Sequence, residues 1–129
     1  MNVMSSDPVA DMLTILRNAT MAGNKIVTLP YSRIKQQLAE ILKREGFLED
    51  VKVEKRRIRI YLRYFDKRSA FLGLKRISKP GVRRYAKAKK LPKVFGNLGF
   101  AIVSTSQGLM TSTEAQKKNI GGEVLCEIW

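Results

Sequence analysis

The sequence predicts an α+β fold in which helices come early and sheet comes late. Two stretches within the first 46 residues repeat apolar side chains at helical spacing. Beyond them, short β-branched and aromatic runs alternate with turn residues, which is the pattern of antiparallel strands. A chain of 129 residues can form two small lobes with a buried core. We expect residues 1–66 to follow the order α-β-α-β-β, and residues 67–129 to be mostly antiparallel β with one short helix.

Two predicted helices dominate the amino-terminal lobe. Asp7 can cap the first helix because its carboxylate accepts a free backbone N–H, and Pro8 suits the first helical position. Gly23 closes this helix. Ser32 caps the second helix, which ends at Gly46. The apolar stripes are Val9, Met12, Leu13, Leu16 and Ala19 in the first helix, and Ile34, Leu38, Ile41 and Leu42 in the second.

Three predicted strands complete this lobe, at residues 25–29, 47–54 and 57–64. The last strand alternates cleanly between apolar and polar side chains, which point to opposite faces. One face carries Ile58, Ile60, Leu62 and Tyr64, and the other carries Arg57, Arg59, Tyr61 and Arg63. The outer surface of the sheet is therefore expected to be a row of guanidinium groups. Such a row also serves to keep an exposed sheet in solution, so it does not identify a binding site by itself.

The carboxyl-terminal lobe is predicted to hold short strands separated by turns. Residues 66–73 connect it to the first lobe, and Pro80-Gly81 and Gly96-Asn97 mark turns. The expected strands cover residues 74–78, 83–86, 100–104 and 123–128.

One short helix interrupts these strands. Thr111 and Glu114 fit the capping box, in which a Thr side chain and a Glu three residues later satisfy each other's backbone N–H groups. The glycine pair Gly121-Gly122 is predicted to end this helix, because glycine readily adopts the conformation that closes one.

The charge distribution indicates a polyanionic partner. The chain holds 25 Lys and Arg against 11 Asp and Glu, a formal net charge of +14. Between Lys67 and Thr113 there are eleven basic residues and no acid, and most of the basic residues lie within residues 75–93. A solvated face or a disordered tail is often as basic, but a tail of pure charge lacks buried-type side chains. Here the charges are interleaved with Ile77, Val82, Tyr85, Leu91 and Val94.

The sequence offers little support for catalysis. Histidine is absent, so the commonest metal ligand and general base are missing. Ser106 as a nucleophile lacks a base and the sharp strand-to-helix turn, and no phosphate-cradling GxxxxGK[ST] motif occurs. Cys126 alternates with Val124 and Ile128, which is typical of a buried, unreactive thiol. We expect no enzymatic activity, no metal, no cofactor and no small-molecule substrate.

The same composition favours a reducing compartment and no membrane partner. Cys126 is the single cysteine, which argues against a secreted disulfide scaffold. No apolar run approaches the roughly 20 residues of a membrane span, and neither predicted helix pairs a broad apolar stripe with a Lys-rich face. The first residues lack the pattern of a signal peptide. A cytoplasmic protein is expected.

Three hydroxyl side chains in a row, Ser104, Thr105 and Ser106, carry no charge. Lys and Arg attract any phosphate backbone, whereas hydroxyls can donate to or accept from bases and ribose 2′-hydroxyls. Gly108 lets the backbone turn and approach a partner closely. Spacing alone favours a turn in which these hydroxyls bond their own main chain. A general nucleic-acid binder is a further alternative, since the charge supports it equally well.

Longer motifs along the chain together resemble a known family. The motifs are SDPVADMLT (residues 6–14) with Arg17-Asn18-Ala19, LPYSRIKQQLAEILKREGFL (29–48), LKRISKPGVRRY (74–85), LPKVFGNLGFAIVSTSQGLMT (91–111), and IGGEVLC (120–126) with a closing Trp129. They resemble small-subunit ribosomal protein eight of the bacterial type. The resemblance runs nearly end to end, and the hydroxyl run and IGGEVLC are its most specific parts.

The resemblance implies a non-catalytic protein that binds directly and site-specifically to the central domain of small-subunit ribosomal RNA and supports its assembly. Neighbouring small-subunit ribosomal proteins are implied partners, and the bacterial cytoplasm is favoured over an organelle. The carboxyl-terminal lobe is expected to provide most contacts. The implied RNA-binding residues are Ser104, Thr105, Ser106, Tyr85, Gly122 and Glu123, with Arg17, Asn18, Ser32 and Arg33 in the amino-terminal lobe. Gln107 beside the hydroxyls, and Lys79, Arg83 and Lys87 of the basic stretch, are expected to bind the same RNA.

The chain also departs from the family's pattern. Ile15 stands where the family usually has Arg, and Gln107 stands where Lys or Arg is common. Glu127 replaces an aromatic residue, and Ser112-Thr113 replaces an Asp-Arg pair. The positive charges missing at positions 15 and 107 are expected to weaken binding without changing its target, because none of these positions is one of the hydroxyls.

Overall fold

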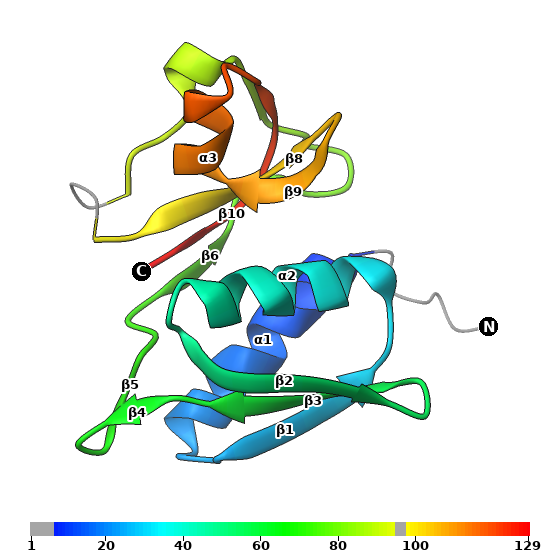
Figure 1. Ribbon diagram of the computed structural model, residues 1–129, viewed down its shortest axis with the longest axis vertical. Helices are drawn as coiled ribbons and strands as arrows, with labels where there is room; N and C mark the ends of the chain where they lie inside the picture. The colour runs from blue at the N-terminus through cyan, green and yellow to red at the C-terminus, as the bar shows by residue number, and fades with distance from the viewer. Residues whose placement is uncertain (1–6, 95–97) are drawn as a thin grey trace. The chain divides into compact units, whose positions relative to one another are not determined.

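The computed structural model describes residues 7–94 and 98–129 and has the predicted α+β composition (Figure 1). The chain folds as two separate units, unit 1 at Met1–Phe71 and unit 2 at Leu72–Trp129. Within the described residues there are three α-helices, and every strand pair is antiparallel. The turn predicted at Gly96-Asn97 lies outside the described residues.

Unit 1 packs two helices on one face of a three-stranded sheet (Figure 1). Strand order is β1-β3-β2, so the last strand in sequence lies in the middle. The predicted alternation of the middle strand is confirmed, since Ile58 and Ile60 are fully buried while Arg57 and Arg59 are exposed. The elements are α1 (Pro8–Met21), β1 (Ile26–Pro30), α2 (Arg33–Arg44), β2 (Leu48–Glu54) and β3 (Arg57–Leu62).

The helix ends of unit 1 follow the sequence closely. The Asp7 carboxylate accepts the Ala10 N–H at 3.1 Å, and the Ser32 hydroxyl accepts the Lys35 N–H at 3.3 Å. Gly23 (φ +73°) and Gly46 (φ +90°) follow the two helices in the left-handed conformation, which glycine adopts without steric cost. Both predicted helices are confirmed, together with their caps.

Unit 1 extends further along the chain than the sequence predicted. A small hairpin, β4 (Tyr64–Phe65) and β5 (Arg68–Ser69), occupies the predicted connector. Its turn places Asp66 and Lys67 at φ 54° and 73° without a glycine to signal it. Phe71 then stacks on Phe47 with ring centroids 5.3 Å apart. These contacts put residues 67–71 in unit 1, whereas the sequence placed the division after Asp66.

Unit 2 is a sheet organised around its last strand, β10. Strand order is β6-β10-β8-β9, and β7 also pairs with β10. One face of the sheet carries a core of Leu91, Ala101, Val103, Met110, Ala115 and Val124. The elements are β6 (Leu74–Arg76), β7 (Tyr85–Ala86), the 3₁₀ turn η1 (Ala88–Lys90), β8 (Phe100–Thr105), β9 (Gly108–Thr111), α3 (Ser112–Lys117) and β10 (Gly122–Ile128).

The predicted strand at residues 100–104 is confirmed as β8, but its end was placed one residue too early. Ser104 and Thr105 end strand β8, and Ser106 and Gln107 form the two-residue turn of a hairpin. The second strand of this hairpin, β9, was missed because it is four residues long and its last residue, Thr111, is also the cap of the next helix. Gly108 has φ +104° and allows the chain to reverse tightly.

The role predicted for Gly121-Gly122 was also wrong. Helix α3 ends at Lys117, and Asn119 at φ 57° turns the chain instead. The glycine pair lies further on, where backbones approach closely. A Cβ atom at Gly121 would overlap the Ala86 carbonyl oxygen, and one at Gly122 would overlap the Ser104 carbonyl oxygen. These glycines therefore allow β10 to pack against its neighbours.

The capping box of α3 is confirmed and gives a stability prediction. The Thr111 hydroxyl accepts the Glu114 N–H at 3.1 Å, and the Glu114 carboxylate accepts the Thr111 N–H at 3.2 Å. Thr111→Ala should lower the free energy of unfolding by about 1–2 kcal/mol, because a terminal N–H loses its acceptor. Chemical denaturation measures this. Thr113→Ala, at an exposed position of the same helix, is the control, and equal losses in both variants would contradict the capping role.

Candidate nucleic-acid interface

Three of the predicted RNA-binding residues form a row across the sheet of unit 2. Glu123 on β10 pairs with Tyr85 on β7 at one edge and with Ser104 on β8 at the other. Residues directly opposite on neighbouring strands share a face of the sheet. Strands lie about 4.8 Å apart, so this β10 row (Tyr85, Glu123 and Ser104) spans roughly 10 Å. The sequence placed these residues 38 positions apart at most, and only the sheet brings them together.

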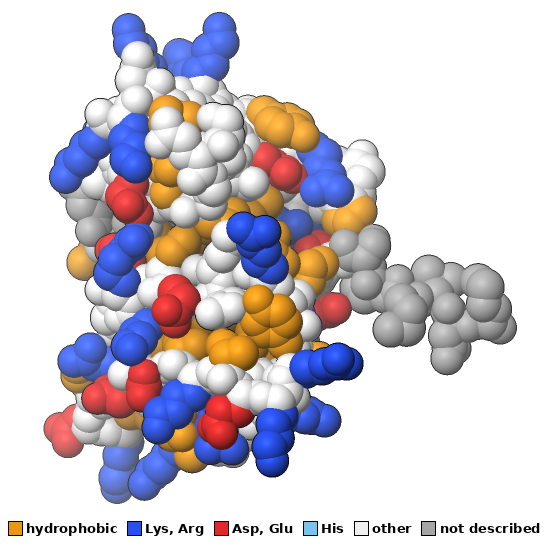
Figure 2. Space-filling view, turned by 45° about the vertical axis from the view of Figure 1, so that its right-hand side comes forward, with side chains coloured by type: hydrophobic (Ala, Val, Ile, Leu, Met, Phe, Trp, Pro, Cys, Tyr) orange, Lys and Arg blue, Asp and Glu red, His pale blue; other side chains and the backbone are white. Residues whose placement is uncertain are grey.

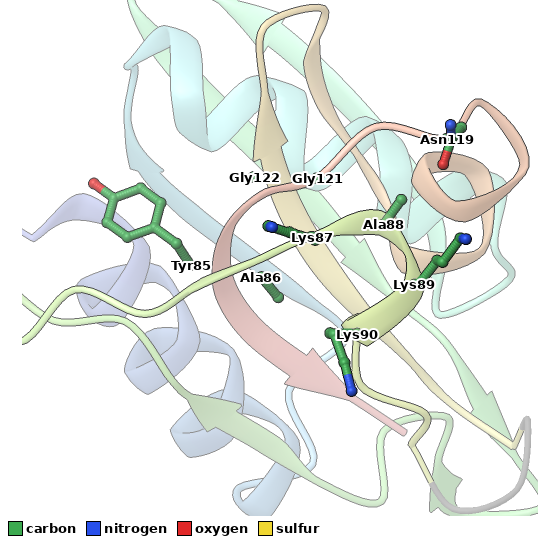
Figure 3. A pocket seen from close by; sticks show the side chains of 9 residues that line it. All are labelled: Tyr85, Ala86, Lys87, Ala88, Lys89, Lys90, Asn119, Gly121 and Gly122. Carbon is green, nitrogen blue, oxygen red and sulfur yellow. The ribbon is translucent and has the colours of Figure 1, made fainter.

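A basic groove lies beside one end of the β10 row (Figure 3). It has a volume of about 780 Å³ and an open shape. Of the described residues, three exposed lysines and no acid line it, so its charge suits phosphate. The Tyr85 ring projects away from the lysines in Figure 3. The lysine groove is lined by Tyr85, Ala86, Lys87, Ala88, Lys89, Lys90, Asn119, Gly121 and Gly122.

The three hydroxyls of the run have different surroundings. The Thr105 hydroxyl donates to the Gly108 carbonyl at 2.8 Å and accepts the Gln107 N–H at 3.1 Å, so it stabilises its own hairpin. This is the self-bonded turn that the spacing favoured. The Ser104 and Ser106 hydroxyls have no hydrogen-bond partner among the described residues, and Ser106 is exposed. Two of the three hydroxyls are therefore available to a ligand.

Glu123 is an unexpected acid on a surface suited to phosphate, and its partners neutralise it. Ser78, which is fully buried, donates its hydroxyl to the Glu123 carboxylate and accepts the Arg84 N–H at 3.1 Å. The Arg83 guanidinium donates to the same carboxylate oxygen of Glu123 at 3.0 Å. Arg83 is thus bound to an acid, although its side chain stays 48% exposed. Through these hydrogen bonds, the Glu123 carboxylate on β10 binds the segment that precedes β7.

The electrostatics of this cluster keep Glu123 ionised. Burial raises the pKa of Glu123, but the hydrogen bonds from Ser78 and Arg83 and the positive charges of Arg83 and Arg76 outweigh burial. The net pKa of Glu123 lies below its ordinary value. The ionised acid is matched locally by guanidinium charge and does not leave an unpaired negative charge facing a phosphate.

The remaining predicted residues lie elsewhere. Lys79 precedes the Pro80-Gly81 turn and lines a separate hollow with Lys75 and Arg84. Arg17 and Asn18 are exposed near the end of α1, whereas Ser32 and Arg33 begin α2. In unit 1 these two pairs therefore lie toward opposite ends of β1, which spans about 17 Å.

Two residues of the site escaped the sequence analysis. Ser78 was treated only as the end of a strand, because nothing local signals that its partner Glu123 lies 45 residues away. Asn119 lines the lysine groove and turns the chain after α3. Asparagine tolerates positive φ, so an Asn just after a capped helix was a usable signal.

Two features would indicate a different class of protein, a metal-binding site and a membrane-spanning helix, and the described part of the chain contains neither. It holds no group of three His, Cys, Asp or Glu side chains able to bind a metal ion. None of its helices is both long and apolar enough to cross a membrane. A basic groove, two hydroxyls without a partner in the described residues and an exposed tyrosine are features typical of a nucleic-acid-binding protein.

Comparison with known proteins gives the family. The chain belongs to the ribosomal protein S8 family, whose sequence pattern matches residues 7–129. Small ribosomal subunit protein uS8 of Nitratidesulfovibrio vulgaris is 50% identical over 126 residues, covering 98% of this chain and 100% of that protein. The uS8 protein of Lysinibacillus sphaericus is 54% identical over 129 residues, covering 96% and 98%. The predicted family is confirmed, and so is the absence of enzymatic activity, since this is a family of structural ribosomal proteins.

The Glu123 cluster predicts a pH-dependent contribution to stability. Glu123→Gln should lower the free energy of unfolding at pH 7 by about 1.5–3 kcal/mol, because hydrogen bonds to a partly buried charge are lost. The pKa of Glu123 is lower in the folded chain than in the unfolded chain, where it is about 4.3. The stabilisation is therefore complete above that pH and is lost as the pH falls through the lowered value.

Urea unfolding at pH 7 and in steps below pH 4 tests this. The difference between wild type and Glu123→Gln should shrink in the acid range. Glu127→Gln on the same strand is the control and should change stability by less than about 0.5 kcal/mol. A wild-type advantage that stayed constant at low pH would show that the carboxylate charge is not what stabilises this cluster.

Proposed function

We propose that this chain, as a non-catalytic protein of the small ribosomal subunit, binds directly and site-specifically to the central domain of small-subunit ribosomal RNA and supports its assembly. Its partners are then that RNA and neighbouring ribosomal proteins, in the cytoplasm of a bacterium. The relatives support this, because they are small-subunit proteins of bacteria. The observation that carries the proposed site is the pair of hydroxyls, Ser104 and Ser106, that have no partner among the described residues, with Ser104 on the same sheet face as the exposed Tyr85.

In the proposed interface, one set of residues provides affinity and another provides selectivity. The lysine groove supplies attraction to phosphates, which does not depend on base sequence. The Ser104 and Ser106 hydroxyls act as donors or acceptors toward bases and ribose, which differ between RNA sites. Tyr85, with 72% of its surface exposed, offers a ring for packing against a base or sugar. Gly122 borders the same site, where its missing side chain leaves room for the Ser104 carbonyl of β8.

A general nucleic-acid binder is the competing function, because charge alone would support it. It would hold unrelated duplexes equally well and lose all of them steeply with salt. The proposed function requires a preference for the central-domain RNA that survives after salt has removed unspecific binding. Titrating the full chain with a central-domain fragment and with an unrelated RNA of the same length, at several salt concentrations, separates the two. Equal affinities at every salt concentration would overturn the proposal.

The hydroxyls should control selectivity rather than electrostatic attraction. Ser104→Ala/Ser106→Ala should weaken binding to the central-domain RNA by about 1–3 kcal/mol and leave the salt dependence almost unchanged. Filter binding or fluorescence anisotropy measures both quantities. Thr14→Ala/Thr113→Ala removes two exposed hydroxyls elsewhere and should have no effect. If the serine variant lost as much affinity for unrelated RNA, these hydroxyls would be folding elements.

The lysine groove should control the salt dependence. Lys87→Gln/Lys89→Gln/Lys90→Gln should weaken binding to all RNAs together and reduce the slope of log affinity against log salt by up to about three. The control Lys25→Gln/Lys67→Gln/Lys117→Gln removes the same charge at exposed positions outside the groove. Its slope should stay close to that of the wild type. An unaltered slope in the groove variant would show that these lysines face solvent in the complex.

A further inference from the structure

We infer that unit 1 carries a second RNA-binding surface, the outer face of its three-stranded sheet, and that this face binds the phosphate backbone of RNA. The inference rests on the proposed function, since it assumes that the chain is surrounded by ribosomal RNA. It concerns a surface that shares no residue with the β10 row or the lysine groove.

The strand register defines the outer sheet face. Lys52 on β2, Arg59 on β3 and Thr28 on β1 lie opposite one another, and Arg57 follows two residues from Arg59 on β3. Because residues in register share a face, these side chains point to the same side. The buried Ile58 and its neighbours point to the other side, where α1 and α2 pack (Figure 1). Among the described residues of unit 1, no helix or strand covers the outer sheet face.

The face and its adjoining turn carry an excess of positive charge. The acids of the face are compensated, because Glu54 pairs with Arg59 at 3.8 Å, Asp50 is bound to Lys43 at 3.0 Å and Glu49 pairs with Arg63 at 3.7 Å. Lys55, Arg56 and Arg57 have no acidic partner within the described residues. The lower part of Figure 2, where Figure 1 places this sheet, shows Lys and Arg side chains projecting into solvent, with Asp and Glu side chains among them.

A shallow hollow lies at the centre of this charge. It has a volume of about 180 Å³ and is lined by Thr28, Glu54, Lys55, Arg57 and Arg59. Guanidinium groups bind phosphate in a bidentate manner, and the acid in the hollow already has a guanidinium partner. Its chemistry therefore fits phosphate oxygens.

The residues of the outer sheet face can bind an RNA backbone but cannot recognise bases. The aromatic ring on this face, Tyr61, has the Lys52 ammonium 5.6 Å from its centre, so a base cannot stack on that side. Protein interfaces place aromatic or apolar anchors at their centre and exclude lysine from it. Here the exposed apolar side chains, Ile26 and Pro30, belong to the edge strand β1. RNA backbone is therefore favoured over an acidic protein as the occupant.

The test compares salt dependence in matched variants of the full chain. Lys55→Gln/Arg57→Gln removes two charges from the outer sheet face and its adjoining turn, and Lys67→Gln/Arg68→Gln removes two from the exposed β4–β5 turn of the same unit. Each phosphate contact contributes about 0.7–0.9 to the slope of log affinity against log salt. Between 50 and 200 mM salt, wild type should therefore lose roughly 7- to 12-fold more affinity for the central-domain RNA than the face variant does. The control should match wild type.

Four outcomes distinguish the possibilities. A flatter slope for the face variant alone, with preference for the central-domain RNA retained, supports the inference. A slope for the face variant equal to that of wild type overturns the inference. The inference is also overturned if the face variant binds RNA as wild type does but reconstituted subunits lose a neighbouring ribosomal protein, because the face would then bind an acidic protein. If the wild-type chain shows no preference for central-domain RNA at any salt concentration, the proposed function fails instead, and the slope comparison still reports whether the face binds phosphate.

Discussion

The pairing of strand β10 with three other strands is the interaction on which unit 2 depends. It bonds β8 along one edge and both β6 and β7 along the other. The close approach is possible because Gly121 and Gly122 have no side chains at the points where the Ala86 and Ser104 carbonyls lie. Without this approach, Tyr85 and Ser104 would not flank Glu123. The candidate interface is therefore a consequence of strand pairing more than of any single segment.

Glu123 shows how one residue serves both the fold and the site. Its carboxylate binds Ser78 and Arg83, which fixes the chain entering β7 and so fixes Tyr85, two residues after Arg83. The same bonds and the nearby guanidinium charges lower the pKa of Glu123 and compensate its charge. An acid can thus lie within a surface suited to phosphate, because its charge is already bound internally.

The sequence was informative wherever the signal is local. The caps of the helices, the apolar stripes and the alternation in β3 depend on residues a few positions apart, and the structure contains all of them. It was least informative where partners lie far apart in the chain, as with Ser78 and Glu123 or Gly122 and Ser104. The hairpin turn at Asp66-Lys67 was missed for a different reason, since turns of this kind usually contain glycine or asparagine.

The site was predicted only in part for the same physical reason. Residues named by motif could be identified, but their grouping needed the strand register. Thr105 illustrates this, because its hydroxyl is bonded within its own hairpin, while the neighbouring Ser104 and Ser106 have no partner among the described residues. Arg83, named for its charge, is bound to Glu123.

The central claim is that Ser104 and Ser106 meet the part of RNA that differs between sites. A high-resolution structure of the chain bound to the central-domain RNA measures this most directly, through the distances from the two serine oxygens to the nearest RNA atoms. The account predicts that at least one of them lies about 2.5–3.2 Å from a base or ribose atom. It would be contradicted if both oxygens were hydrogen-bonded to their own backbone, or met only phosphate, while the RNA rested elsewhere on the chain.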